Sequence, residues 1–154
     1  MSDYEQIVVP YDFSAHSRAA LATASDLARR LGAKLHLVHV ILQPSFSYGH
    51  GGYGAAAAPP PPVMPELREQ AEASLRDVAA GVAGPLAAEP HVLEGGDVTE
   101  TLLLAAEKLG ADLIVMGTHG RTGLAHVFLG SVTERMLRRA PCPVLGVQAP
   151  EEDA

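Results

Sequence analysis

Hydrophobic residues alternate along this chain between short, nearly continuous apolar runs and longer stretches with helical spacing. Continuous runs of this kind are typical of strands that are buried on both faces of a parallel sheet. Pro90 interrupts the third run and favours an edge position for it, because proline cannot donate a hydrogen bond to a neighbouring strand. The predicted strands are residues 6–10, 34–41, 86–93, 112–116 and 142–147.

Apolar residues recur every three or four positions between the first strands, which predicts amphipathic helices. The first helix has Ser14 as its predicted N-cap and Gly32 just beyond its end. The second begins at Pro65, since proline suits a first helical turn. We expect this second helix to stop at Gly84 and Pro85.

Two further helices are predicted from their capping residues. Asp97 followed by Glu100 has the spacing of a capping box, and Gly110 ends that helix. Ser131 followed by Glu134 reads as a full capping box, with Ser131 as the N-cap of a short last helix.

The regular alternation of strands and helices predicts a single α/β domain over residues 1–154. Its core is an open five-stranded parallel sheet with helices on both faces and right-handed crossovers. Ligands of such sheets bind beyond the carboxyl ends of the strands, where the strand order reverses. Asp12 follows the first strand and a glycine-rich loop follows the fourth, so we expect both at one edge of the sheet.

Residues 43–65 break the pattern. They contain Tyr48–Gly54 with four glycines, four consecutive alanines and Pro59–Pro62. We interpret them as a long mobile loop within the domain, because the element pattern resumes unchanged afterwards.

Composition narrows the classes of function. A formal net charge of −7 argues against nucleic acid as a partner, because phosphate backbones are bound by basic surfaces. No apolar run reaches the roughly 18 residues that a membrane helix needs. The acidic, polar N-terminal residues and the single cysteine, Cys142, favour a cytoplasmic location. We interpret Cys142 as a small apolar core residue rather than a nucleophile.

The glycine-rich loop carries the chemistry of interest. Its spacing is Gly117-x2-Gly120-x9-Gly130-Ser131. Backbone N–H groups in such a loop, and at the start of the helix behind it, suit a phosphate. The sequence contains no Gly-Lys-Ser or Gly-Lys-Thr and no dinucleotide fingerprint after the first strand, which excludes the two commonest nucleotide loops.

This glycine spacing resembles the ATP-binding pattern of the universal stress protein family. The resemblance extends to residues 8–14, 37–40, 112–120 and 140–145, and so covers nearly the whole chain outside the 43–65 segment. It implies an adenine nucleotide alpha hydrolase-like, Rossmann-like sheet with strand order 3-2-1-4-5. It further implies a homodimer that pairs through the last strand, and a regulatory or interaction role in the stress response that depends on ATP.

The resemblance also implies a role for individual residues. Asp12 with its neighbours would contact adenosine, Val40 would offer backbone groups to adenine, and the loop and last helix would reach ribose and phosphates. Asp12 is also the candidate to hold Mg²⁺ through water. The implied binding residues are Pro10, Tyr11, Asp12, Val40, Met116, Gly117, Gly120, Arg121, Gly130, Ser131, Val132 and Thr133.

Several alternatives stay open from the residues alone. The glycines could serve only as turns, Asp12 as a turn residue, Ser131 as a cap, and Arg121 as a solvated loop residue. No catalytic base or loop lysine is evident, so a slow Mg²⁺-dependent ATPase, a nucleotide-free interaction protein, and a binder of AMP or cyclic AMP are the rival functions.

The seven histidines show no pattern of metal ligands. His36 and His39 are three apart on a strand and point to opposite faces. His119, within the glycine loop, is interpreted as a solvated loop residue. We therefore predict no metal site built from side chains alone.

Overall fold

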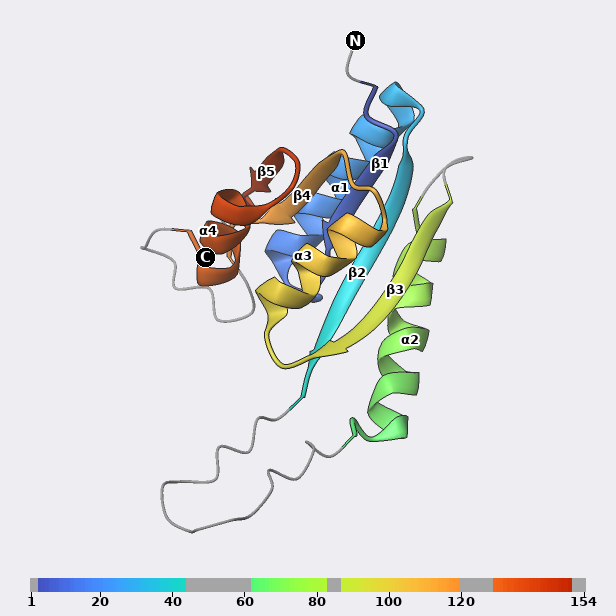
Figure 1. Ribbon diagram of the computed structural model, residues 1–154. Coiled ribbons are helices and arrows are strands. Elements are labelled where there is room, and N and C mark those ends of the chain that lie inside the picture. Colours follow the sequence, from blue (N-terminus) through green and yellow to red (C-terminus); the bar gives the residue numbers. More distant parts are fainter. Residues whose placement is uncertain (1–2, 44–61, 83–86, 120–128, 151–154) are drawn as a thin grey trace.

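A computed structural model describes residues 3–43, 62–82, 87–119 and 129–150. Within these ranges five parallel strands form one sheet in the order β3-β2-β1-β4-β5, which confirms the predicted fold class (Figure 1). The strands are β1 Gln6–Pro10, β2 Lys34–Leu42, β3 Ala88–Gly95, β4 Leu113–Gly117 and β5 Val144–Val147. The helices are α1 Ala15–Leu31, α2 Pro65–Ala80, α3 Val98–Lys108 and α4 Ser131–Arg139.

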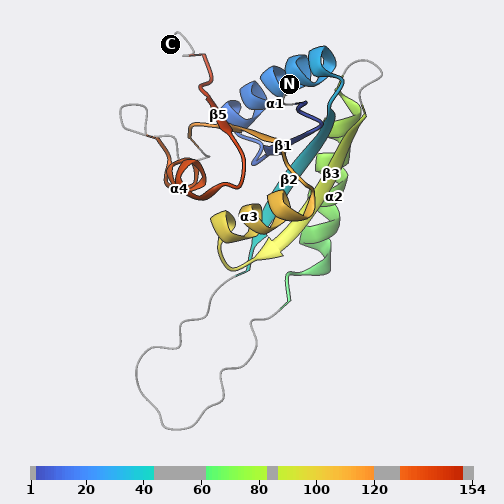
Figure 2. The same cartoon turned by 45° about the horizontal axis from the view of Figure 1, so that its top comes forward.

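The sheet is the middle layer of three, with α1 and α2 on one face and α3 and α4 on the other (Figure 2). Successive strand residues point to opposite faces. Ile7 and Val9 therefore pack with α1 and α2, whereas Val8 packs with α3 and α4. Two buried cores explain why the strands are apolar without alternation.

Most helix boundaries follow the predicted signals. The Ser14 side chain accepts a hydrogen bond from the Ser17 N–H, and Gly32 closes α1 in the left-handed conformation at φ 68°. Pro65 lies in the first turn of α2. The predicted end of α2 is wrong by several residues, because Gly81 already closes the helix with N–H bonds to the Asp77 and Val78 carbonyls.

Two strand boundaries also differ from the prediction. β3 begins at Ala88, two residues late, and pairs with β2 along its whole length from Ala88 to Gly95. Its edge position is confirmed. β5 begins at Val144 rather than Cys142, because Pro143 has no N–H to donate, although its carbonyl still accepts from the Ile114 N–H.

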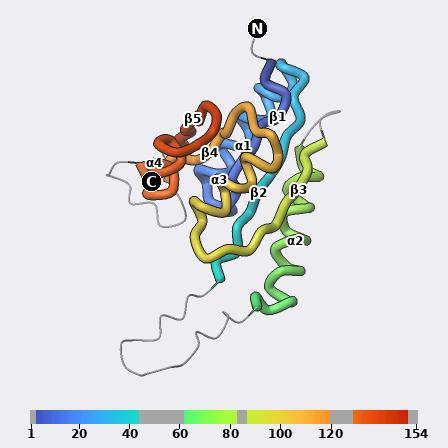
Figure 3. The backbone as a smooth tube through the Cα atoms, viewed as in Figure 1, coloured from blue at the N-terminus to red at the C-terminus, as the bar shows by residue number. Residues whose placement is uncertain are grey.

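The tube view in Figure 3 traces the central strands, with β1 and β4 as neighbours although they are distant in sequence. None of the described helices is long and apolar enough to span a membrane. Residues 44–61, which make up most of the predicted 43–65 loop, lie outside the described residues.

Candidate functional site

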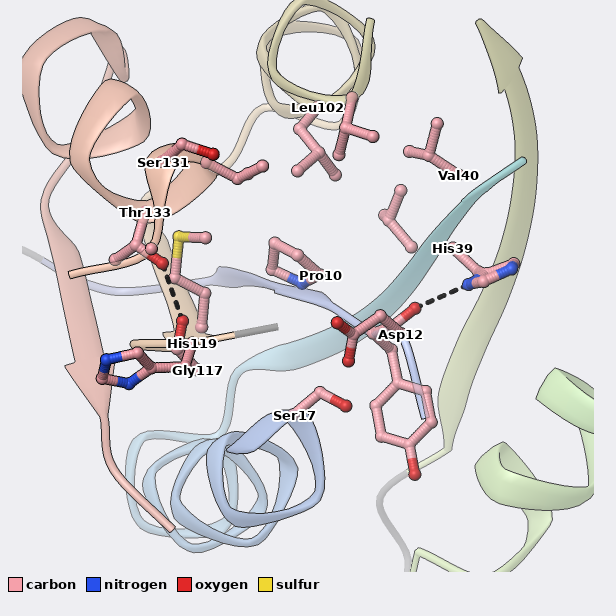
Figure 4. Close-up of a pocket in the computed structure, with 16 residues that line it drawn as sticks. Pro10, Asp12, Ser17, His39, Val40, Leu102, Gly117, His119, Ser131 and Thr133 are labelled. Carbon is pink, nitrogen blue, oxygen red and sulfur yellow. Dashed lines mark hydrogen bonds between the residues drawn. The ribbon is translucent and has the colours of Figure 1, made fainter. Parts of the chain in front are cut away.

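A cavity of about 270 Å³ lies beyond the carboxyl ends of β1 and β4, where the strand order reverses (Figure 4). Ten of the twelve residues that the sequence predicts as binding residues line it. Gly120 and Arg121 lie outside the described residues. The ten are Pro10, Tyr11, Asp12, Val40, Met116, Gly117, Gly130, Ser131, Val132 and Thr133.

The segment after β1 forms one wall. The Tyr11 N–H donates to the Val38 carbonyl over 2.8 Å, so this segment stays attached to β2 past the end of the strand. Asp12 Oδ1 accepts from the Ser14 N–H over 3.0 Å. Asp12 is therefore both a turn residue and a cavity-lining residue, and the two interpretations are compatible.

Tyr11, which lines this wall, is only 5% exposed and belongs to the core between the sheet and α1. Burial raises the pKa of the Tyr11 hydroxyl.

Phe13 holds this wall in an uncommon backbone conformation, with φ at 65°. A bulky residue adopts that region only where its surroundings impose it. The Phe13 ring meets Tyr11 and His39 edge-on, each at a centroid distance of 5.1 Å. His39 Nδ1 also lies 2.8 Å from the Tyr11 carbonyl oxygen. This cluster fixes the turn that presents Asp12.

The segment after β4 forms the opposite wall, and Gly117 is placed there by close packing. A Cβ on Gly117 would lie 2.7 Å from His16 Cβ and 2.8 Å from the His16 carbonyl carbon. Gly117 is therefore a glycine because α1 crosses directly against it. The sequence favoured a phosphate-binding role for this glycine, and the structure adds a packing requirement that stands whether or not a ligand binds.

The start of α4 corrects the predicted capping box. The N-cap is Gly130, not Ser131, and no side chain makes a cap hydrogen bond there. Ser131 is instead the first helical residue, and the Glu134 carboxylate is drawn away to Arg138 at 2.9 Å. The first turn of α4 thus faces the cavity without a side-chain cap, which suits an anion.

Thr133 ties this helix start to β4. Its buried hydroxyl donates to the Gly117 carbonyl over 2.9 Å, as Figure 4 shows. The Gly130 N–H donates to the Thr118 carbonyl over 2.7 Å. These two bonds hold the first turn of α4 directly beside the end of β4.

Ion pairs anchor α4 to α3 on its other side. Arg135 lies 3.1 Å from Asp97, and Arg139 pairs with Glu100. The Glu100 N–H and then the Arg135 guanidinium lower the pKa of Asp97, while the Arg139 guanidinium chiefly lowers that of Glu100. Both arginines are thus engaged with α3.

Sequence reasoning missed several residues of the cavity wall. Ser17, which is 4% exposed, comes from α1, and Val98 and Leu102 come from α3. They carry no motif, and only the packing of their helices brings them here. Val38 and His39 arrive from β2 in the same way.

His119 also belongs to the wall and is only half-buried rather than fully solvated. Its Nδ1 lies 3.0 Å from Thr118 Oγ1, and its ring centroid lies 5.0 Å from that of His16. The interpretation of His119 as a solvated loop residue therefore needs correction, because the end of β4 packs against α1 at this point.

The charge of the described wall is set by few groups. Asp12 is its one carboxylate, and among the described lining residues there is no lysine or arginine. Among these described residues, the attraction for an anion comes from the α4 N-terminus and from neutral donors.

The sequence and the fold are both similar to those of known proteins. The family model for the universal stress protein family matches residues 3–148. A universal stress protein of Methanocaldococcus jannaschii is 35% identical over 97% of this chain and 85% of its own length. A universal stress protein solved in complex with cAMP is 26% identical, with a TM-score of 0.69 over 97% of this chain and 100% of that one.

A further solved structure, the universal stress protein from Archaeoglobus fulgidus in complex with dAMP, is 21% identical. It covers 94% of this chain and 98% of its own at a TM-score of 0.66, and so shows the shared fold. The match over nearly the whole length, with the adenine nucleotide alpha hydrolase-like strand order, shows that this chain belongs to the universal stress protein family.

Proposed function

We propose that this protein binds an adenine nucleotide, with ATP as the expected ligand, in the cavity between β1, β4 and α4. The observation that carries the proposal is convergence. Four separate stretches of the sequence, for each of which the family resemblance implies contact with a nucleotide, contribute residues to one cavity at the switch point of the sheet. Two relatives of the same fold were solved with cAMP and dAMP.

The cavity has an apolar side that suits a base. Val40, Leu102 and Met116 line it from β2, α3 and β4. A flat, weakly polar ring gains most from such surfaces, while the free backbone edge of a strand end supplies directional hydrogen bonds. The adenine would therefore lie toward the end of β2.

The other side suits phosphate. The uncapped first turn of α4 supplies backbone N–H groups and the positive end of the helix dipole. Ser131 keeps its hydroxyl for a ligand, because it does not serve as the N-cap. Asp12, on the facing wall, is placed to contact ribose hydroxyls or to hold Mg²⁺ through water.

One observation favours a second ligand, AMP or cyclic AMP. The described wall has no basic side chain to offset the charge of a triphosphate. ATP would need a cation from Arg121, which lies outside the described residues, or from Mg²⁺. We expect Mg²⁺ to strengthen the binding of ATP far more than the binding of AMP.

Calorimetry with ATP, AMP and cyclic AMP, each with and without Mg²⁺, tests the proposal. Gly130→Glu places a carboxylate at the anion-binding turn, and the backbone angles of Gly130, φ −56° and ψ 153°, are ones that residues with side chains also adopt. We expect this substitution to lower the affinity for ATP at least tenfold. Gly96→Glu is the matched control, because a Cβ there meets nothing within 4 Å. No nucleotide heat in the unmodified protein, or equal affinity in Gly130→Glu, would refute the proposal.

We further propose that nucleotide occupancy regulates interactions of a cytoplasmic homodimer paired through β5. β5 is an edge strand, and Leu145 on it is 39% exposed. Open edge strands are normally covered, and a second copy of the same strand would cover this one. α4 and β5 lie next to each other in sequence, so ligand contacts on α4 are well placed to reach the pairing edge.

A further inference from the structure

A second group of polar side chains lies away from the nucleotide cavity, toward the amino ends of β2 and β3. His36 on β2 is the register partner of Glu89 on β3, and His91 lies two residues further along β3. One ligand atom from each of the three lies within 4.8 Å of the other two. We refer to His36, Glu89 and His91 as the His36 cluster.

The distances within the cluster are close to those of a coordination sphere. His36 Nδ1 and His91 Nε2 are 3.0 Å apart. Glu89 straddles them, with Oε2 at 3.8 Å from His36 Nδ1 and Oε1 at 3.8 Å from His91 Nε2. Two ligands on a tetrahedral zinc ion lie about 3.3 Å apart. The nitrogens need only part slightly, and the Glu89 side chain, which is 45% exposed, would have to turn from its ion pair with Lys34 to approach an ion.

Gln6 prepares His36 as a ligand. Gln6 Oε1 lies 2.8 Å from His36 Nε2. An amide oxygen can only accept a hydrogen bond, so His36 Nε2 carries the proton in this arrangement. The Nδ1 atom of His36 then presents its lone pair to the cluster. His36 is only 3% exposed, so packing holds its ring in this orientation. An imidazole that is oriented in this way through its other nitrogen is well prepared to bind metal.

We propose that the His36 cluster binds a divalent transition-metal ion of the zinc class, with His36 Nδ1, His91 Nε2 and one Glu89 oxygen as protein ligands. Two imidazoles and a carboxylate suit zinc, whereas magnesium and calcium prefer oxygen alone. The fourth position falls to solvent. His91 also lines a cavity of about 460 Å³ between β3 and α3, which gives an ion a path to the cluster.

The sequence could not show this group, because no local spacing links His36 to residues 89 and 91. Only the β2–β3 register unites them. The prediction that side chains alone build no metal site rested on spacing along the chain, and we here propose otherwise.

A metal-free explanation competes with the proposal. The Lys34 ammonium lies 2.6 Å from Glu89 and holds the pKa of that carboxyl below its usual value. Together with the histidine–histidine hydrogen bond, this pair could serve only to fix the edge strand. The two explanations differ for Lys34→Gln, which removes the competing cation. If the cluster is a metal site, Lys34→Gln should bind zinc more tightly than the unmodified chain. If the cluster is purely structural, Lys34→Gln should not bind zinc.

Zinc titration of the full chain by calorimetry, without nucleotide, tests the proposal. We expect one zinc ion per chain, and at least a tenfold loss of affinity in Glu89→Gln and in His91→Asn. Glu107→Gln and His16→Asn are the matched controls, which remove a carboxylate and an imidazole elsewhere, and both should bind zinc as the unmodified chain does. Absence of zinc binding, or equal zinc affinity in His91→Asn and His16→Asn, would contradict the proposed site.

A second measurement separates loss of ligand from loss of fold. Gln6→Met leaves all three ligands in place and removes only the acceptor of the His36 Nε2 proton, which should weaken zinc about 10- to 100-fold. Nitrogen NMR of the imidazoles should show zinc on His36 Nδ1 and His91 Nε2. The proposed ligands would be contradicted if zinc affinity is unchanged in Gln6→Met and if the imidazole nitrogen signals of His36 and His91 do not shift when zinc is added.

Discussion

At the scale of single residues, Gly117 shows how one position serves both packing and a site. The His16 backbone and Cβ lie where a side chain would go. We expect Gly117→Ala to lower the free energy of unfolding by about 1–3 kcal/mol, since overpacking forces neighbouring backbone to shift. Urea unfolding would measure this. Gly96→Ala is the control, because open space surrounds it and its stability should stay unchanged or rise. Equal midpoints for the two variants would contradict the packing explanation.

Cys142 gives a second prediction at this scale. It is half-buried against the core on the α3 and α4 side of the sheet. Burial, with a smaller effect of Asp112, raises the pKa of the Cys142 thiol, so less thiolate forms in the folded protein than in the unfolded chain. A thiol reagent near pH 8 should therefore react at least tenfold faster in denaturing urea than in buffer. Equal rates would show that the thiol is exposed and reactive.

At the scale of elements, the position of α4 depends on Thr133. Thr133→Val keeps the shape of the side chain but leaves the Gly117 carbonyl without its donor. We expect a loss of about 1 kcal/mol in unfolding free energy, together with weaker nucleotide binding. Thr133→Ser keeps the hydroxyl and should retain most of the affinity. Nucleotide affinity that falls equally in both variants would mean that the hydroxyl does not position the helix.

The boundaries of the helices show which features can be predicted from the sequence and which cannot. Ser14, Gly32 and Asp97 were predictable because caps act through nearest neighbours in the chain. The Ser131 capping box was wrong because Glu134 pairs with Arg138 and Gly130 makes the turn, a choice that depends on where β4 ends.

The candidate site also contains residues that the sequence could predict and residues that it could not. The placement of Asp12, Gly117 and Gly130 at one edge was predictable from strand order, because the carboxyl ends of parallel strands lie at the same edge of a sheet. Ser17 and Leu102 were not, since they reach the cavity through the packing of α1 and α3. The His36 cluster depends on the register of two strands and was equally hidden from local spacing.

At the scale of the whole molecule, the exposed edge of β5 is the expected pairing surface. Leu145→Lys would place a charge on that edge, and we expect it to convert a dimer to monomers in analytical ultracentrifugation. Leu104→Lys on α3, where the leucine is 56% exposed, is the control and should leave the dimer intact. Dissociation by both variants, or by neither, would place the interface elsewhere.

The proposed function requires that an adenine nucleotide occupies the cavity between β1, β4 and α4. Native mass spectrometry of the full chain, titrated with ATP and Mg²⁺, tests it most directly because mass identifies ligand and stoichiometry together. We predict one ATP per chain, on a species of two chains, with the nucleotide lost in Gly130→Glu and kept in Gly96→Glu. An unmodified chain that stays unliganded at saturating ATP, or a Gly130→Glu variant that binds ATP equally well, would contradict nucleotide binding in this cavity.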